Sequence, residues 1–133
     1  MRRASGIGRV FAHAFILWAA SAAAATPAPG PVKITVVMVD YKFEPDQLTF
    51  RHDVHYQLHL ENHGKETHEF TAPVFFATSK IDNPDVLNRE QTEVLMQPGD
   101  QKDIFLTPLK PGTYDLRCED HDWYGMVGGI TVE

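Results

Sequence analysis

An all-β fold, either an antiparallel sandwich or a barrel, is the fold class that this sequence predicts. Short segments alternate apolar and polar residues with the period of two that a half-buried strand requires. Pro and Gly turns separate these segments, and strands do not alternate with long helices as they do in parallel α/β sheets. At 133 residues the chain is long enough for one domain, and it contains no internal repeat.

The first 25 residues have the composition of a secretory signal peptide, and we set them aside from the fold. Three arginines lie among the first nine residues, and an apolar run at 10–20 is too short to span a bilayer. Residues 21–26 offer small-residue cleavage sites, most simply after Ala25. We therefore expect export to the periplasm and no membrane span after processing. An uncleaved anchor is the alternative.

The predicted domain covers residues 32–133, after a Pro-rich lead-in at 26–31. A β-branched strand is expected at 32–39, and a second extended stretch at 41–50 is interrupted by Pro45. In the strand at 54–60, the residues Val54, Tyr56, Leu58 and Leu60 point one way, whereas His55, Gln57 and His59 point the other way.

The second half of the domain has clear turns and one ambiguous segment. After a turn at 61–66, residues 68–76 read as extended but broken at Pro73, and residues 77–93 fit a short helix or a long loop. Residues 94–101 contain a Pro-Gly turn. Residues 102–118 read as strand, Pro-Gly turn and strand, and residues 126–133 form a closing strand.

The charge of the mature chain limits its partners. All 18 acidic residues lie after residue 25, against nine Lys and Arg, so the formal charge is −9. This charge disfavours nucleic acid and anionic membranes, and it favours a basic partner that is attracted over long range. An acidic surface that serves only solubility is the alternative.

The segment CEDHDWYGM (118–126) contains the single cysteine of the chain. A lone thiol in an oxidising compartment is a liability unless it is buried, paired between chains or bound to a metal. Cys118, His121 and Met126 fall between two strands, and a thiolate, an imidazole and a thioether form a soft ligand set that suits copper. His68, which opens a strand after a turn, is the candidate for the second imidazole.

Two alternatives compete with copper at these residues. Structural zinc prefers several thiolates or four strong ligands, whereas this chain offers one thiolate and a thioether. The other alternative is a buried inert Cys118, a core Met126 and an unrelated surface His121. The joint order and spacing of the three residues favour copper.

The residues also resemble a known family, the cupredoxins or type 1 blue copper proteins of the plastocyanin, pseudoazurin and amicyanin kind. The ligand loop C-x2-H-x4-M is matched by CEDHDWYGM, the preceding PGTYxxxC run by PGTYDLRC, and the family ending by GGITV. Upstream, YKFEPDQLTF is similar to the F-x-P-x2-L stretch, and ENHGKETHEF to the stretch that carries the first histidine ligand. The resemblance covers residues 34–133.

The resemblance implies a Greek-key β-sandwich that holds one copper ion. By motif position His68, Cys118 and His121 would be equatorial ligands, Met126 the long axial ligand, and Asn62 a polar residue that pins the ligand loops. The ring edge of His121 is expected to face solvent, with Trp123 and Tyr124 either packed in the loop or forming a docking surface beside it.

The expected function is that of an exported one-electron carrier that cycles between Cu(I) and Cu(II). It would act as a monomer on a redox protein such as a cytochrome or an oxidase with a basic docking surface. The alternative is a periplasmic copper-binding protein for copper buffering or tolerance. An enzyme is not expected, because His-x-His pairs and a second cysteine are absent from the sequence.

Some positions depart from the resemblance. Glu69 and Glu119 occupy the places of a linking hydrogen-bonded pair, so their side chains either meet or diverge into solvent. Four further histidines, His52, His55, His59 and His63, are either solvated side chains or part of a weaker second copper site. His55 and His59 lie about 13 Å apart along a strand, so the two alone cannot chelate one ion.

Overall fold

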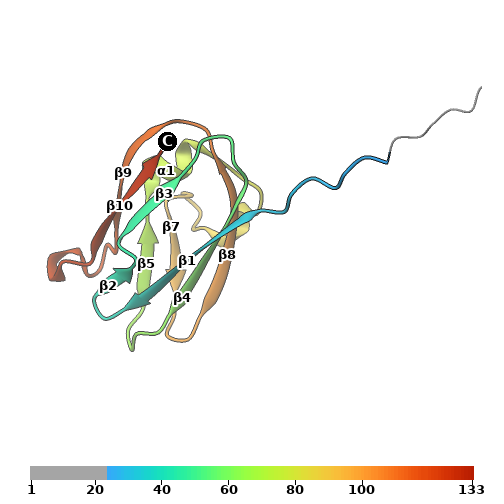
Figure 1. Ribbon diagram of the computed structural model, residues 1–133. Helices are drawn as coiled ribbons and strands as arrows, with labels where there is room; N and C mark the ends of the chain where they lie inside the picture. Colours follow the sequence, from blue (N-terminus) through green and yellow to red (C-terminus); the bar gives the residue numbers. More distant parts are fainter. Residues whose placement is uncertain (1–23) are drawn as a thin grey trace, which may run out of the picture.

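The computed structural model describes residues 24–133, which form two five-stranded sheets packed face to face (Figure 1). In spatial order, the first sheet contains β2 (Lys42–Glu44), β1 (Val32–Val39), β4 (Tyr56–Asn62), β8 (Gln101–Pro108) and β6 (Ser79–Ile81). The second contains β3 (Gln47–Phe50), β10 (Val127–Val132), β9 (Gly112–Arg117), β5 (His68–Thr71) and β7 (Glu93–Met96). The predicted β-sandwich is confirmed, and the barrel alternative is excluded.

The period-two pattern places the core between the sheets. Along β4 the residues Tyr56, Leu58 and Leu60 are buried, and the residues between them are only partly covered. Leu58 pairs with the buried Ile104 of β8, so apolar side chains from neighbouring strands face the same interior. Burial of this continuous apolar face is the main favourable term in the stability of the sandwich.

Two strand pairs are parallel, so the predicted antiparallel pairing is wrong there. β1 pairs with β4 and β3 pairs with β10 in parallel, whereas the other pairs are antiparallel. After β2 the chain crosses to the second sheet to form β3, and it returns to the first sheet as β4 beside β1. A parallel pair needs such a crossover, and a period-two pattern does not report it.

The segment after β5 differs from its prediction. Residues 73–76, expected as extended chain, belong to the short helix α1 (Pro73–Ala77). Pro73 at the start of this helix has the fixed φ and missing N–H that suit a first helical turn. The ambiguous segment 77–93 contains the 3-10 turn η1 (Pro84–Val86), which fits the expected short helix, and the edge strand β6, which was not predicted.

The predicted signal peptide lies outside the described residues, apart from Ala24 and Ala25. Residues 24–31 are exposed and carry no secondary structure. Within the described part of the chain, no helix is long and apolar enough to cross a membrane.

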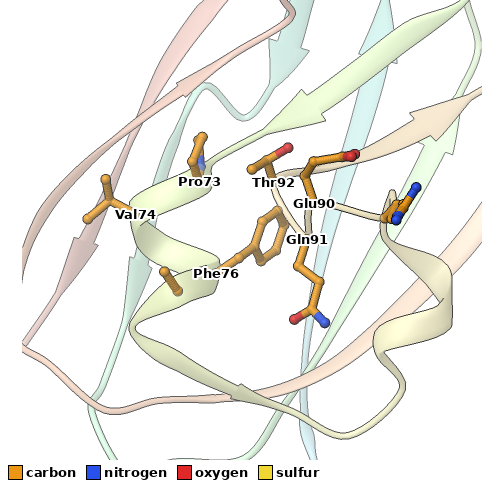
Figure 2. A pocket seen from close by; sticks show the side chains of 8 residues that line it. Pro73, Val74, Phe76, Glu90, Gln91 and Thr92 are labelled. Atoms are coloured by element: carbon orange, nitrogen blue, oxygen red, sulfur yellow. The ribbon is translucent and has the colours of Figure 1, made fainter.

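A pocket of about 540 Å³ lies between α1 and the loop 89–92. Figure 2 shows Pro73, Val74 and Phe76 on its helix side and Glu90, Gln91 and Thr92 opposite. None of the four predicted copper ligands lines this pocket, so it is separate from the candidate metal centre.

Candidate metal centre

The fold brings the predicted ligand residues to one end of the sandwich. His68 is the first residue of β5, Cys118 follows β9 directly, His121 precedes the 3-10 turn η2 (Asp122–Tyr124), and Met126 directly precedes β10. Figure 1 shows the loop between β9 and β10, at the lower left, beside β2. His68, Cys118 and Met126 are fully buried.

Three donor atoms form a small triangle. The Nδ1 atoms of His68 and His121 are 3.2 Å apart, and the Sγ atom of Cys118 lies 3.4 Å from Nδ1 of His121 and 3.9 Å from Nδ1 of His68. The centre of such a triangle is about 2 Å from each atom, close to the lengths of metal–nitrogen and metal–thiolate bonds. In the described residues these three side chains form the one group whose potential ligand atoms all lie within 4.8 Å of one another.

The hydrogen bonds of the two imidazoles show which nitrogen is free to bind a metal. Nε2 of His68 lies 2.8 Å from Oδ1 of Asp40, and Nε2 of His121 lies 3.0 Å from Oε2 of Glu66. A carboxylate only accepts hydrogen bonds, so each Nε2 carries a proton, and each neutral ring has its lone pair on Nδ1. The two Nδ1 lone pairs and the Cys118 sulfur therefore lie together, and a cation bound between them would be stabilised by all three.

The Cys118 thiol is held by two hydrogen bonds with Glu69. Its S–H donates to Oε2 of Glu69 at 3.0 Å, and the backbone N–H of Glu69 donates to Sγ at 3.4 Å. Burial, together with the hydrogen bond to Glu69, raises the pKa of the Cys118 thiol to about 12. A metal that binds the thiolate must therefore displace this proton.

Backbone hydrogen bonds set the shape of the ligand loop. The N–H of Cys118 donates to the carbonyl of Met126 at 3.0 Å, and the N–H of Met126 donates to the carbonyl of His121 at 3.2 Å. Gly125 has a φ of 88°, a left-handed conformation that glycine adopts at low cost. The loop is thus closed at both ends, which fixes the spacing of its donor residues.

Asn62 pins the turn that leads to His68. Its side-chain N–H₂ donates to the carbonyls of Glu66 and Met96, and its Oδ1 accepts from the N–H of Gly64. A β-carbon on Gly64 would collide with Asp40 Oδ1 and approach Nε2 of His68. The turn therefore packs directly against the first imidazole of the centre.

The exposed ring edge expected for His121 is absent. Its side chain is only 11% exposed, because Glu66 holds Nε2 and Tyr41 lies over the ring with centroids 4.9 Å apart. Tyr41 stacks on Tyr124 at 4.5 Å, and the ring of Tyr124 contacts Trp123. Trp123 is 71% exposed, so the two loop aromatics form a surface beside the centre rather than a buried packing element.

Glu69 and Glu119, the two acidic residues that depart from the family resemblance, have different partners. Glu69 is buried against Cys118 and also accepts the N–H of Asp120, whereas Glu119 is exposed and pairs with Arg117 at 3.0 Å. The hypothesis that the side chains of Glu69 and Glu119 meet is therefore wrong. Every residue of β5 is buried, so the side chain of Glu69 lies inside the protein, within hydrogen-bond distance of the Cys118 sulfur.

The other four histidines in the described part of the chain are paired with acidic or carbonyl oxygens. His52 contacts the carbonyl of Glu133, and His55 contacts Asp82. His59 lies between Asp103 and Glu61, and His63 contacts the other oxygen of Glu61. None of the four belongs to the compact three-residue group found among residues 24–133.

The sequence did not single out Asp40, Tyr41 or Glu66. Asp40 is 28 residues from His68 and Glu66 is 55 residues from His121, so no local spacing connects either pair. The one local signal is the position of Glu66 in the turn two residues before a ligand histidine.

The chain belongs to the family described as the cupredoxin-like domain, which matches residues 9–132. A 48-residue segment is 46% identical to chloroplastic plastocyanin of Hordeum vulgare, and an equally similar match is found in Oryza sativa subsp. indica. These matches cover 36% of this chain and only 30% of each plastocyanin.

Solved structures agree on the fold. Auracyanin from Roseiflexus castenholzii is 17% identical, with a TM-score of 0.57 over 78% of this chain and 99% of that chain. A multi-copper oxidase from Pediococcus acidilactici is 13% identical, with a TM-score of 0.59 over 83% of this chain and 28% of that chain. The family and the donor set together indicate one type 1 copper ion as the cofactor.

Proposed function

We propose that this protein is a one-electron carrier in which His68, Cys118, His121 and Met126 hold the copper ion. Three of these donors converge in the fold, where the Nδ1 atoms of His68 and His121 lie 3.2 Å apart and each Nε2 is bonded to a carboxylate. This convergence is the observation that supports the proposal most strongly. When bound, copper would supply the chemistry of one-electron transfer between Cu(I) and Cu(II).

The protein residues hold the centre in a fixed geometry. The ligand loop is closed by backbone bonds, Asn62 pins the opposite turn, and the donors lie in the interior of the sandwich. A rigid, dry site lets the ligands keep one arrangement in both oxidation states, so little has to reorganise when an electron moves. We therefore propose a carrier rather than an enzyme.

The surface beside His121 supports docking of a redox protein. Trp123 and Tyr124 are exposed, and the exposed acidic residues Glu119 and Asp122 belong to the same loop. A basic redox partner, such as a cytochrome or an oxidase, would be attracted to this face. We propose that the exported protein acts in the periplasm as a monomer.

Copper buffering or tolerance is the second candidate function. The dense histidines and acidic side chains of the surface favour it, since such groups bind copper weakly. The burial of His68, Cys118 and Met126 favours the carrier, because a buffer must exchange its metal readily.

Stopped-flow mixing of the copper-loaded, reduced mature protein with a small basic c-type cytochrome separates the two functions. The carrier predicts rapid second-order reduction of the cytochrome with no release of copper to a chelator. Slow reduction, together with rapid loss of copper to the chelator, would support buffering instead. Trp123→Ala should slow the reaction if this face docks, and Val32→Ala is the matched exposed apolar control on β1.

A further inference from the structure

Both imidazoles of the centre hydrogen-bond to carboxylates through the nitrogen that faces away from the other donors. Asp40 accepts from Nε2 of His68, and Glu66 accepts from Nε2 of His121. A carboxylate in this position fixes the tautomer and orientation of the ring and increases the basicity of the ligating nitrogen. Asp40 and Glu66 come from different turns of the chain, and each makes the same kind of hydrogen bond to one imidazole of the centre.

Each carboxylate is itself held in place. The backbone N–H of Lys65 donates to both oxygens of Asp40, at 3.2 and 2.9 Å. The hydroxyl of Tyr41 donates to Oε1 of Glu66 at 3.0 Å, which leaves Oε2 for His121. Both carboxylates therefore have their own supporting donors, as positioning groups require.

The negative charge of the two groups affects the two oxidation states of copper unequally. Cu(II) carries one more positive charge than Cu(I), so a nearby carboxylate stabilises the oxidised ion more. The side chain of Asp40 is 24% exposed and that of Glu66 is 50% exposed. Because water screens exposed charges, the influence of Asp40 should exceed that of Glu66.

We propose that Asp40 and Glu66 are positioning residues that orient His68 and His121 toward the metal and bias the centre toward Cu(II). This inference rests on the proposed function, in which these two histidines hold copper. Asp40 makes the larger contribution. Glu66, by holding Nε2 of His121 beneath Tyr41, also keeps that ring from solvent.

The test is to measure the affinities for Cu(II) and Cu(I) separately, with chelators specific for each ion, in wild type and in isosteric amide variants. Asp40→Asn keeps an oxygen that accepts the hydrogen bond but removes the charge. We expect a loss of Cu(II) affinity of about 10-fold or more and a smaller loss of Cu(I) affinity. If the Cu(II) affinity falls tenfold more than the Cu(I) affinity, the reduction potential is higher by about 59 mV. Glu66→Gln should act in the same direction with a smaller change.

Asp122→Asn is the matched control, because it removes one charge from the ligand loop without removing a hydrogen bond to either imidazole. Equal ratio changes in Asp40→Asn and Asp122→Asn would overturn the inference, as would an unchanged ratio in Asp40→Asn. Nitrogen NMR of the metal-free protein adds a second readout. Asp40→Ala should lose the single Nε2–H tautomer of His68, and retention of that tautomer would contradict the positioning role.

These outcomes are distinct from failure of the proposed function. If wild type shows no thiolate-to-copper colour, the copper carrier itself is refuted. If wild type is coloured and the amide variants match it in both affinities, only the role of the two carboxylates is refuted.

Discussion

Met126 is the predicted ligand whose replacement tests the oxidation-state balance without removing the thiolate. Met126→Leu is close in volume, and such core exchanges usually cost less than about 1.5 kcal/mol of stability. We expect the variant to keep its visible colour and to have a higher reduction potential, because a weak thioether donor to Cu(II) would be lost. Each tenfold loss of Cu(II) affinity relative to Cu(I) corresponds to about 59 mV in voltammetry. An unchanged potential would show that Met126 is only a core residue.

The raised pKa of Cys118 predicts that copper affinity depends on pH. The thiol has a pKa of about 12, so it is protonated at neutral pH, and copper must displace the proton. Each increase of one pH unit below that pKa makes the thiolate about tenfold more available, so the apparent affinity should rise about tenfold per unit from pH 6 to 8. Competition titrations in buffers with weak copper affinity measure this slope. A flat profile would show that binding releases no net proton.

The candidate donor residues could be selected from the sequence, whereas their surroundings could not. A thiolate, an imidazole and a thioether within nine residues form a local pattern, and such a pattern is visible without a structure. The carboxylates of Asp40 and Glu66 reach the imidazoles only because the β1–β2 and β4–β5 turns lie at the same end of the sandwich. Contacts of this kind depend on topology, which local spacing does not contain.

At the scale of the secondary structure, strands were predicted best where one face of the strand is apolar and the other face is polar. β1 and the break at Pro45 between β2 and β3 follow the expected pattern. The three-residue strand β6 is too short for a period of two to be recognised, and in α1 a proline that starts a helix was read as a strand breaker. Parallel pairing was missed because side-chain alternation is the same in parallel and antiparallel strands.

The pairing of β4 with β8 predicts a contribution to acid stability. Hydrogen bonds from Gln57 and His59 lower the pKa of the Asp103 carboxyl below its usual 3.8. A carboxyl whose folded pKa is lowered stabilises the protein above its unfolded pKa, and this stabilisation is lost as pH falls through the folded pKa.

Asp103→Asn should therefore lower the free energy of unfolding by about 0.5 kcal/mol at pH 6, a modest value because the pair is partly solvated. The difference from wild type should shrink as pH falls below about 4. Urea unfolding of the metal-free protein from pH 3 to 6 measures it, with Asp85→Asn in η1 as a control away from the strand pair. A difference that stays constant over this range would contradict the role of the ion pair.

At the scale of the whole molecule, residues 26–133 combine a formal charge of −9 with an exposed aromatic surface beside the centre. Association with a basic redox partner should slow as added salt shortens the Debye length from about 30 Å at 0.01 M to about 10 Å at 0.1 M. Stopped-flow rates with the basic cytochrome over this range test the prediction. A rate that does not change would show that Trp123 and Tyr124, rather than charge, govern docking.

The optical spectrum of the copper-loaded protein tests the central claim most directly. If Cys118 and the two histidines hold a type 1 copper ion, the oxidised protein should have a strong thiolate-to-copper band in the visible region, with one copper per chain. The band should vanish on reduction and be absent from Cys118→Ser. A copper-loaded wild type without this band, or a Cys118→Ser variant that retains it, would contradict the assignment.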